Sequence, residues 1–382
     1  WLLAAISWQG IKFREDCSWT PQSLVVGLLL WAWSGESTLG ERFRECRKLV
    51  QALFPEQVPL AGSYQAFLKM AGRWTKELQT HLITEFRRQM QKGEGLIKVW
   101  RVVGWAVFAV DGTRIDLPRS NGNEECYAPQ PKPAGKQQKK QKQGQARDSK
   151  QEQARRRKAE IPQMWLTALW HVGSGLPWDF RLGHSGSSER NHLQEMLGEL
   201  PKEKCLVVGD AGFVGYELWS AVLQAGHQFV IRVGGNVGLL RELGYVEERA
   251  DTVYLWPHHS ASKKRPPLVL RLVTVPLAEG AIYLATSVLA EEELSSQAVA
   301  EVYRLRWGVE VFYRHCKQTF ERAKLRSRNP RHAEIEMIWS LLGIWAIGLH
   351  SHCYLVPRGV APAKISFVNV LRAYRTTMRC YR

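Results

Sequence analysis

Two apolar segments, each followed by an aspartate, constrain the fold of this chain more than any other feature. Residues 106–110 precede Asp111, and residues 205–209 precede Asp210. Short apolar runs of this kind, bounded by polar or glycine residues, are typical of strands buried within a sheet. Polar side chains that follow buried strands gather at one edge of an α/β sheet, where functional sites tend to lie. We therefore expect Asp111 and Asp210 to face a common site.

The segments around these two strands predict a mixed α/β sheet flanked by helices. Residues 163–172 and 176–182 are apolar or alternating, and Gly173-Ser174-Gly175 between them is a hairpin signal. The remaining elements follow along the chain, with strands expected at 229–231 and 282–288, several short strands between 234 and 280, and helices at 188–200, 217–225, 295–320 and 332–352.

Residues 1–100 are expected to be helical. Thr20-Pro21 is typical of a helix start, a second helix over 38–53 carries four basic residues, and Ser63 precedes a third, long helix. A helix, a short turn and a basic helix are compatible with a unit that reads DNA. A plain helical bundle explains the same pattern, and the sequence does not separate the two interpretations.

An excess of positive charge favours a polyanionic partner. The 382 residues include 53 Lys and Arg against 36 Asp and Glu, which gives a net charge of +17. Proteins that bind nucleic acid carry such an excess because it neutralises phosphates. Residues 132–158 hold 11 of the basic residues, beside Asp148 and Glu152. This basic run has almost no apolar residues, so we expect a solvated loop that either binds nucleic acid nonspecifically or only increases solubility.

Composition excludes several other classes of protein. Hydrophobic residues make up 45% of the chain, which excludes a wholly disordered protein and a disulfide-stapled mini-protein. Seven cysteines without a CxxC pair argue against a zinc knuckle and favour a reduced compartment. Residues 337–357 lack charged side chains, but several polar ones favour a buried helix over a membrane span. The chain begins at Trp1, without a Met or a basic segment, so we expect no signal peptide and an incomplete gene start.

A third acid, Glu310, belongs to the helix predicted over 295–320. It follows Asp210 by 100 residues, and Asp210 follows Asp111 by 99, so each acid comes from a different element. Three carboxylates with few histidines favour Mg²⁺ or Mn²⁺ over zinc. Two such ions about 3.5–4 Å apart can activate a water or a 3′-hydroxyl for attack on a phosphodiester. Taken singly, each aspartate is equally compatible with an ordinary turn or a strand-to-helix loop.

The helix around Glu310 is predicted to carry a polar stripe. At 100° per residue, an arc of about 60° contains Tyr303, Arg306, Glu310 and Lys317. The opposite side is apolar and consists of Leu305, Val309, Phe312, Cys316 and Phe320. An acid flanked by cations suits a metal ligand beside phosphate contacts. A solvated helix face with incidental charges is the alternative.

These motifs resemble those of a known family. The Tyr-Arg-Glu-Lys signature of DDE-type insertion-sequence transposases is similar to Tyr303-x2-Arg306-x3-Glu310-x6-Lys317. The segments 110–113 and 209–213 also resemble motifs of that family, and the resemblance covers residues 100 to 350, approximately. It implies a ribonuclease H-like core, with a β-rich insertion between the second aspartate and the glutamate.

The resemblance also implies roles for individual residues. It implies a catalytic site in which two divalent ions, Mg²⁺ or Mn²⁺, are bound by Asp111, Asp210 and Glu310. It implies that phosphates of the transposon end are held by Tyr303, Arg306 and Lys317. Family members that form hairpin ends hold a flipped base on an aromatic side chain. The candidates for that role are Trp256 and Tyr283, and spacing does not select either.

A domain organisation follows from the same resemblance. A helical N-terminal region, a candidate for DNA binding, is expected at 1–100. The catalytic core is expected in two parts, 101–233 and 281–355, with a basic flexible insertion at 119–160, the β-rich insertion at 234–280 and a C-terminal tail at 356–382.

The implied activity is that of a DNA transposase, which cleaves transposon ends and joins them to target DNA by two-metal-ion phosphodiester transfer. The expected partners are double-stranded DNA, as transposon ends and target, and a second copy of the chain in a homodimer assembled on DNA, with no membrane. The implied location is the cytoplasm of a prokaryote, in association with the nucleoid. Two alternatives stay open: an inactivated or repurposed transposase that only binds DNA, and a metal-dependent nuclease without strand transfer.

Overall fold

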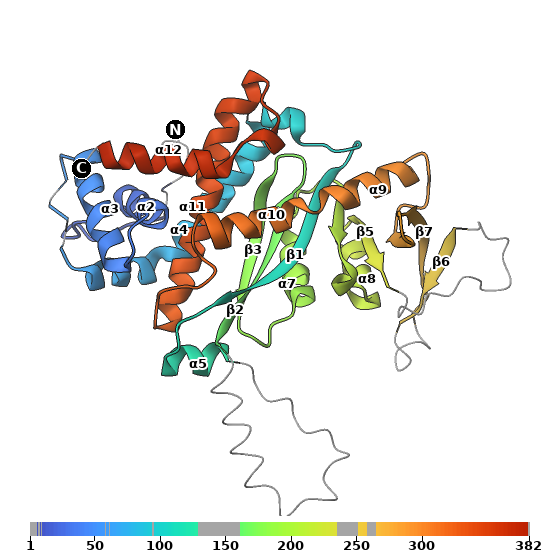
Figure 1. Cartoon of the computed structure of the whole chain (residues 1–382), viewed down its shortest axis with the longest axis horizontal. Helices are drawn as coiled ribbons and strands as arrows, with labels where there is room; N and C mark the ends of the chain where they lie inside the picture. Colours follow the sequence, from blue (N-terminus) through green and yellow to red (C-terminus); the bar gives the residue numbers. More distant parts are fainter. Residues whose placement is uncertain are drawn as a thin grey trace, which may run out of the picture.

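The computed structural model describes residues 10–380 apart from 58, 61, 94, 129–160, 235–250 and 258–264, together with Ile6 and Trp8. Within these residues, a mixed sheet of eight strands has the order β3-β2-β1-β4-β5-β8-β7-β6 (Figure 1). The strands are β1 (Ala106–Asp116), β2 (Gln163–His171), β3 (Leu176–Gly183), β4 (Cys205–Gly209), β5 (Gln228–Val233), β6 (Thr252–Leu255), β7 (Leu268–Pro276) and β8 (Ala281–Thr286).

The strand directions confirm the predicted ribonuclease H-like sheet. β1, β2 and β3 form an antiparallel meander, and β4 and β5 continue from β1 in parallel. β8 pairs antiparallel with β5, and β7 and β6 extend the sheet from there. The strands of the predicted insertion at 234–280 therefore lengthen the core sheet instead of forming a separate layer.

Helices cover both faces of the sheet (Figure 1). They are α2 (Pro21–Trp33), α3 (Leu39–Leu53), α4 (Tyr64–Lys92), α5 (Asn121–Tyr127), α7 (Glu189–Met196), α8 (Tyr216–Gln224), α9 (Ser296–Leu305), α10 (Gly308–Arg314), α11 (Pro330–Leu355) and α12 (Phe367–Cys380). Leu206 and Val208 of β4 pack in one core with Val299 of α9. The residue between them, Val207, belongs to the larger core that includes Trp219 of α8. This alternation is the two-residue period of a strand buried on both faces.

The N-terminal helices pack on α11 as a helical bundle. Thr20 and Ser63 cap α2 and α4 as the sequence predicts. The indole N–H of Trp339 on α11 donates to Thr75 Oγ1 on α4 at 2.9 Å, and α2 also packs against α11. On α3, Arg42 is buried and donates to the carbonyl of Glu36, so the basic face is smaller than the sequence indicates. DNA binding by this region stays a prediction.

Three predicted elements differ from the structure. β1 does not end before Asp111 but continues to Asp116, because the β2 partner runs alongside it over the whole length. The predicted flexible insertion at 119–160 is wrong for its first ten residues, which include α5; the amide of Asn123 there donates to the carbonyls of Pro118 and Ser327. The basic run at 132–158 lies outside the described residues.

The third difference is the helix predicted over 295–320, which is broken into α9, α10 and a π-helical turn over His315–Thr319. The indole Nε1 of Trp170 on β2 lies 2.9 Å from the position of a Cβ on Gly308, so the chain can approach β2 only with a glycine here. Backbone bonds of the tighter i→i−3 type join Val309 to Arg306 at this break. The apolar segment at 337–357 lies mostly in the buried α11, as expected. Across the residues that are described, no helix has the length and hydropathy required to span a membrane.

Candidate active site

The two aspartates lie level with each other on neighbouring parallel strands. Ala109 of β1 pairs with Val208 of β4, and each aspartate follows two residues later. Adjacent strands are about 4.8 Å apart, so this register brings Asp111 and Asp210 together as predicted. Asp210 is the N-cap of a short 3₁₀ turn, where its Oδ1 accepts from the N–H of Gly212 at 2.8 Å.

Glu310 reaches the same site from the first turn of α10. Its Oε1 pairs with Nη2 of Arg306 at 3.1 Å, and the Arg306 guanidinium lies 5.5 Å from the ring centre of Tyr303. Arg306 is only 9% exposed, and no hydrogen-bond acceptor in the described chain contacts its Nε. Three residues of the predicted stripe, Tyr303, Arg306 and Glu310, are therefore in contact across the helix break. Arg306, however, is mostly buried instead of projecting into solvent.

Tyr313 fixes α10 to the strand that carries Asp111. Its hydroxyl donates to the backbone carbonyl of Asp111 at 2.5 Å and accepts from the N–H of Ala168 at 3.1 Å. Asp111 and Ala168 are opposite residues of the β1–β2 ladder. The tyrosine hydroxyl thus bridges the two strands at the level of the aspartate and holds Glu310, one turn earlier on α10, over the same point.

Lys317 also contacts β1. Its Nζ donates to Thr113 Oγ1 at 2.7 Å, two residues beyond Asp111. Lys317 lies in the π-helical turn, and single π turns inside helices are frequent at functional sites. Lys317 thus lies near Asp111 on β1, while Arg306 contacts Glu310 and Tyr303; phosphate binding by the three residues stays a prediction.

The electrostatics of Asp111 show that the acids share one environment. The pKa of Asp111 is raised to about 6, chiefly by burial and to a smaller extent by repulsion from Asp210 and Glu310, while a backbone hydrogen bond from Gly112 and the charge of Arg306 oppose the rise. A cation bound nearby would stabilise the ionised form of such a carboxylate.

Glu189 is a fourth acid at this site, and the sequence-based prediction did not include it. A Cβ placed on Gly112 would overlap Glu189 Oε2, and a Cβ on Gly212 would lie 3.0 Å from Glu189 Oε1. Burial raises the pKa of Glu189, and Asp210 and Asp111 add to that rise. The one available signal was topological: β3 runs parallel to β1, so the helix that follows β3 begins near the edge where Asp111 lies.

The carboxylates lie in the same region but are not close enough together to form a complete set of metal ligands. Among the residues that the structure describes, no three Asp, Glu, His or Cys side chains are close enough to hold one metal ion. Asp210 accepts a hydrogen bond from the N–H of Gly212, and Glu310 pairs with Arg306. The donor set consists of carboxylate oxygens, which fits a hard divalent cation and not zinc.

Comparison with known proteins identifies the family. A family model described as the transposase DDE domain matches residues 106–345, which is more than half of the chain. The chain belongs to the DDE transposase family. Members of this family depend on divalent metal ions in general, in agreement with the oxygen ligands gathered here.

Individual relatives of this transposase family match over shorter lengths. The transposase InsG of insertion sequence element IS4 from Escherichia coli K12 is 29% identical over 194 residues, 48% of this chain and 43% of InsG. The putative transposase InsL of IS186A, also from Escherichia coli K12, is 36% identical over 70 residues, 18% of this chain and 19% of InsL. The chain thus matches less than half the length of either relative. A solved piggyBac transposase synaptic complex with hairpin DNA is similar at a TM-score of 0.48 and 12% identity, over 99% of this chain and 77% of that one.

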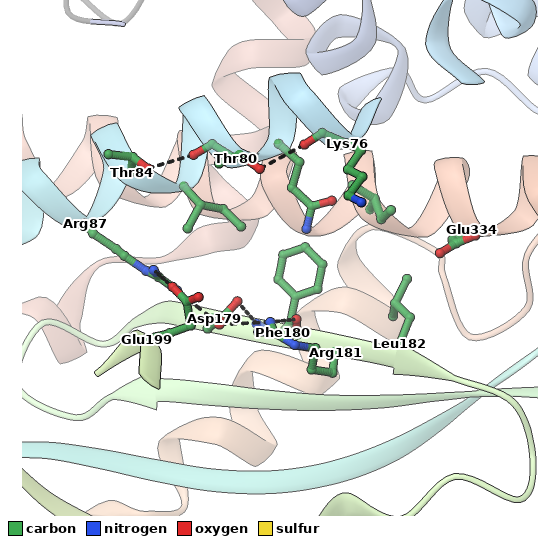
Figure 2. Close-up of a pocket in the computed structure, with 13 residues that line it drawn as sticks. Lys76, Thr80, Thr84, Arg87, Asp179, Phe180, Arg181, Leu182, Glu199 and Glu334 are labelled. Carbon is green, nitrogen blue, oxygen red and sulfur yellow. Dashed lines mark hydrogen bonds and ion pairs between the residues drawn. The ribbon is translucent and has the colours of Figure 1, made fainter. Parts of the chain in front are cut away.

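A separate pocket of about 420 Å³ lies between α4, β3 and α11 (Figure 2). Four of its charged groups are paired: Asp179 contacts Arg87 at 3.1 Å and Arg181 at 2.9 Å, and Arg87 also pairs with Glu199. The two other charged residues of the lining, Lys76 and Glu334, have opposite signs. Burial raises the pKa of Asp179, and both arginines oppose that rise. Because these charges are matched, the pocket offers no excess charge to a polyanion, and we interpret it as a structural junction.

The two aromatic candidates for a flipped base remain predictions. Tyr283 is 44% exposed on β8, and Trp256 is half-buried just after β6. Neither donates a hydrogen bond to an acidic residue within the described ranges, and the structure does not favour one over the other.

Proposed function

We propose that this chain is a DNA transposase that cleaves the ends of an insertion-sequence element and joins them to target DNA. One observation supports the proposal: Asp111 of β1 lies on the strand next to that of Asp210 and interacts electrostatically with Asp210 and with Glu310 of α10, in a chain of the DDE transposase family. In this proposal the catalytic residues are Asp111, Asp210 and Glu310.

The same three acids would hold the metal ions, Mg²⁺ or Mn²⁺, and we propose two ions as the sequence implies. When bound there, such ions activate a water or a 3′-hydroxyl and stabilise the leaving oxygen of a phosphodiester. The protein's own contribution is position. Tyr313 holds Asp111 and α10 together, and Arg306 orients the Glu310 carboxylate through their ion pair.

Tyr303, Arg306 and Lys317 are proposed to bind phosphates of the element's end. The Nε of Arg306 lacks a partner in the described structure, so a phosphate oxygen could satisfy a donor that the protein leaves unpaired. Lys317 lies beside Asp111 through its bond to Thr113, which places a second cation near the acids. The proposed partners are double-stranded DNA, as ends and target, and a second copy of the chain when assembled on DNA.

A cleavage assay tests the proposal. The inverted repeats that flank the gene supply the DNA duplex, and purified chain is incubated with it and with Mg²⁺ or Mn²⁺. We expect strand cleavage at the repeat end and joining of the 3′-hydroxyl to a second duplex. Asp111→Asn, Asp210→Asn and Glu310→Gln should abolish cleavage and leave end binding largely intact. Asp116→Asn, at the end of β1 where Gln163 donates to the carboxylate, is the matched control and should cleave like the parent.

The outcome also separates the alternatives. Binding without cleavage by the parent chain under all metal conditions would support a repurposed DNA-binding protein. Hydrolysis of the strand without joining would support a nuclease. Cleavage that survives Asp111→Asn would contradict the assignment of the site itself.

A further inference from the structure

Glu189 is an acid whose surroundings give it no structural partner. It lies half-buried in the first turn of α7. In the described chain, its carboxylate accepts no hydrogen bond and forms no ion pair. A half-buried carboxylate that is left unpaired destabilises the folded protein, and the favourable dipole at the start of α7 offsets that cost only in part.

The position of this carboxylate is set by two glycines that follow the two aspartates. Its Oε2 fills the space where Gly112 would carry a Cβ, and its Oε1 lies 3.0 Å from the corresponding point on Gly212. Asp210 Oδ1 lies 2.9 Å from that same point on Gly212. An oxygen of Glu189 and an oxygen of Asp210 therefore flank one point, and the main chain carries no side chain there.

Arg190 and Trp165 lie beside these two glycines. Arg190, next to Glu189, donates from Nε to the carbonyl of Gly212 at 2.6 Å and so fastens the start of α7 to the loop after β4. The buried indole Nε1 of Trp165 lies 3.3 Å from the Cβ position of Gly112, and none of the described residues accepts its hydrogen bond. The space beside Gly112 thus holds an unpaired acceptor and an unpaired donor.

We propose that Glu189 is a fourth acidic residue of the metal site and binds the cation, directly or through a bound water, on the side of Asp210. The proposal rests on the proposed function, because it assumes that the acids hold divalent ions. Its carboxylate is a hard oxygen ligand, and among the described residues the one ion pair to these four acids joins Arg306 to Glu310. The glycines after Asp111 and Asp210 are then explained, since any side chain would displace the fourth ligand.

Metal binding by the full chain, without DNA, tests this role. Mn²⁺ is titrated into the parent chain and into Glu189→Gln, and free Mn²⁺ is followed by electron paramagnetic resonance. We expect about a tenfold or larger loss of Mn²⁺ affinity in Glu189→Gln. Glu195→Gln changes an exposed acid of the same helix and is the matched control, with unchanged affinity expected.

A second variant reaches the same point without removing a charge. Gly112→Ala keeps every carboxylate but places a methyl group where Glu189 Oε2 lies, so it should weaken Mn²⁺ binding to a similar extent. The double variant Gly112→Ala/Glu189→Gln should bind no more weakly than Glu189→Gln alone. Parent-like affinity in Glu189→Gln, with affinity lost in Asp111→Asn, would overturn the role of Glu189 and leave the proposed function standing. Unchanged affinity in both would overturn the metal site as a whole.

Discussion

Replacing Asp111 by asparagine should stabilise the metal-free protein while it abolishes cleavage. The pKa of Asp111 is raised from 3.8 to about 6, chiefly by burial. The folded protein therefore binds a proton more tightly than the unfolded chain does at this position. The contribution of Asp111 to stability is therefore greatest below about pH 4 and falls as the pH rises toward 6, because the folded protein must then hold an ionised carboxylate in a buried site.

The size of the effect follows from the pKa. Each unit of pKa difference corresponds to about 1.4 kcal/mol, so a rise of about two units destabilises the folded state by about 3 kcal/mol above pH 6. Asn carries no charge and avoids this cost. We expect Asp111→Asn to be more stable than the parent by up to about 3 kcal/mol at pH 7.5, and equally stable below pH 4.

Chemical denaturation in EDTA, at pH 3.5, 5 and 7.5, measures the free energy of unfolding of the parent and of Asp111→Asn at each pH. Asp116→Asn, on the same strand, controls for the loss of an aspartate. Repeating the series in Mn²⁺ should reduce the difference in stability between Asp111→Asn and the parent, because a cation that binds the folded parent stabilises the parent and not the variant. An Asp111→Asn protein no more stable than the parent at pH 7.5 in EDTA would refute the argument.

Two further predictions concern the contacts around the acids. Tyr313→Phe should lower the free energy of unfolding by about 1–3 kcal/mol, because it leaves a buried N–H and C=O of the β1–β2 ladder unpaired; Tyr374→Phe, which loses an exposed hydroxyl contact, is the control in the same denaturation series. Arg306→Ala should raise the pKa of Asp111 above about 6, because Arg306 lowers it in the parent. The fall in stability that accompanies ionisation of Asp111, measured in EDTA, should then occur at a higher pH than in the parent. Arg304→Ala, at the exposed end of α9, should leave the pH of that fall unchanged.

Much of the site was predictable because its signals are local. Residues 106–110 and 205–209 are apolar runs that are each followed by an aspartate, and parallel pairing of the two strands sets Asp111 beside Asp210. The helix caps at Thr20 and Ser63 were predictable because a capping residue bonds to the helix only a few residues later in the chain. The polar stripe around Glu310 also follows from helical spacing, although the helix is interrupted within it.

The features that could not be predicted depend on contacts between distant segments. The break at Gly308 follows from the approach of Trp170, which is more than a hundred residues earlier in the chain. The burial of Arg306 depends on how α9 and α10 lie on the sheet. Glu189 has no motif of its own, and its place is visible only once the two glycines after the aspartates are seen to lie against it.

The packing of the N-terminal helices on α11 has a consequence for shortened forms of the gene. Apolar residues of α2, α4 and α11 belong to the same core as residues of β1 and β4. The indole N–H of Trp33 donates to the carbonyl of Gly343, and the buried guanidinium of Arg322 to that of Ala32. A deletion that removed the first hundred codons would keep the codons for Asp111, Asp210 and Glu310. Its product, however, would expose the apolar face of α11 to water and aggregate. Loss of the 5′ end would thus inactivate a copy of this gene by preventing folding, without any change to the proposed catalytic residues.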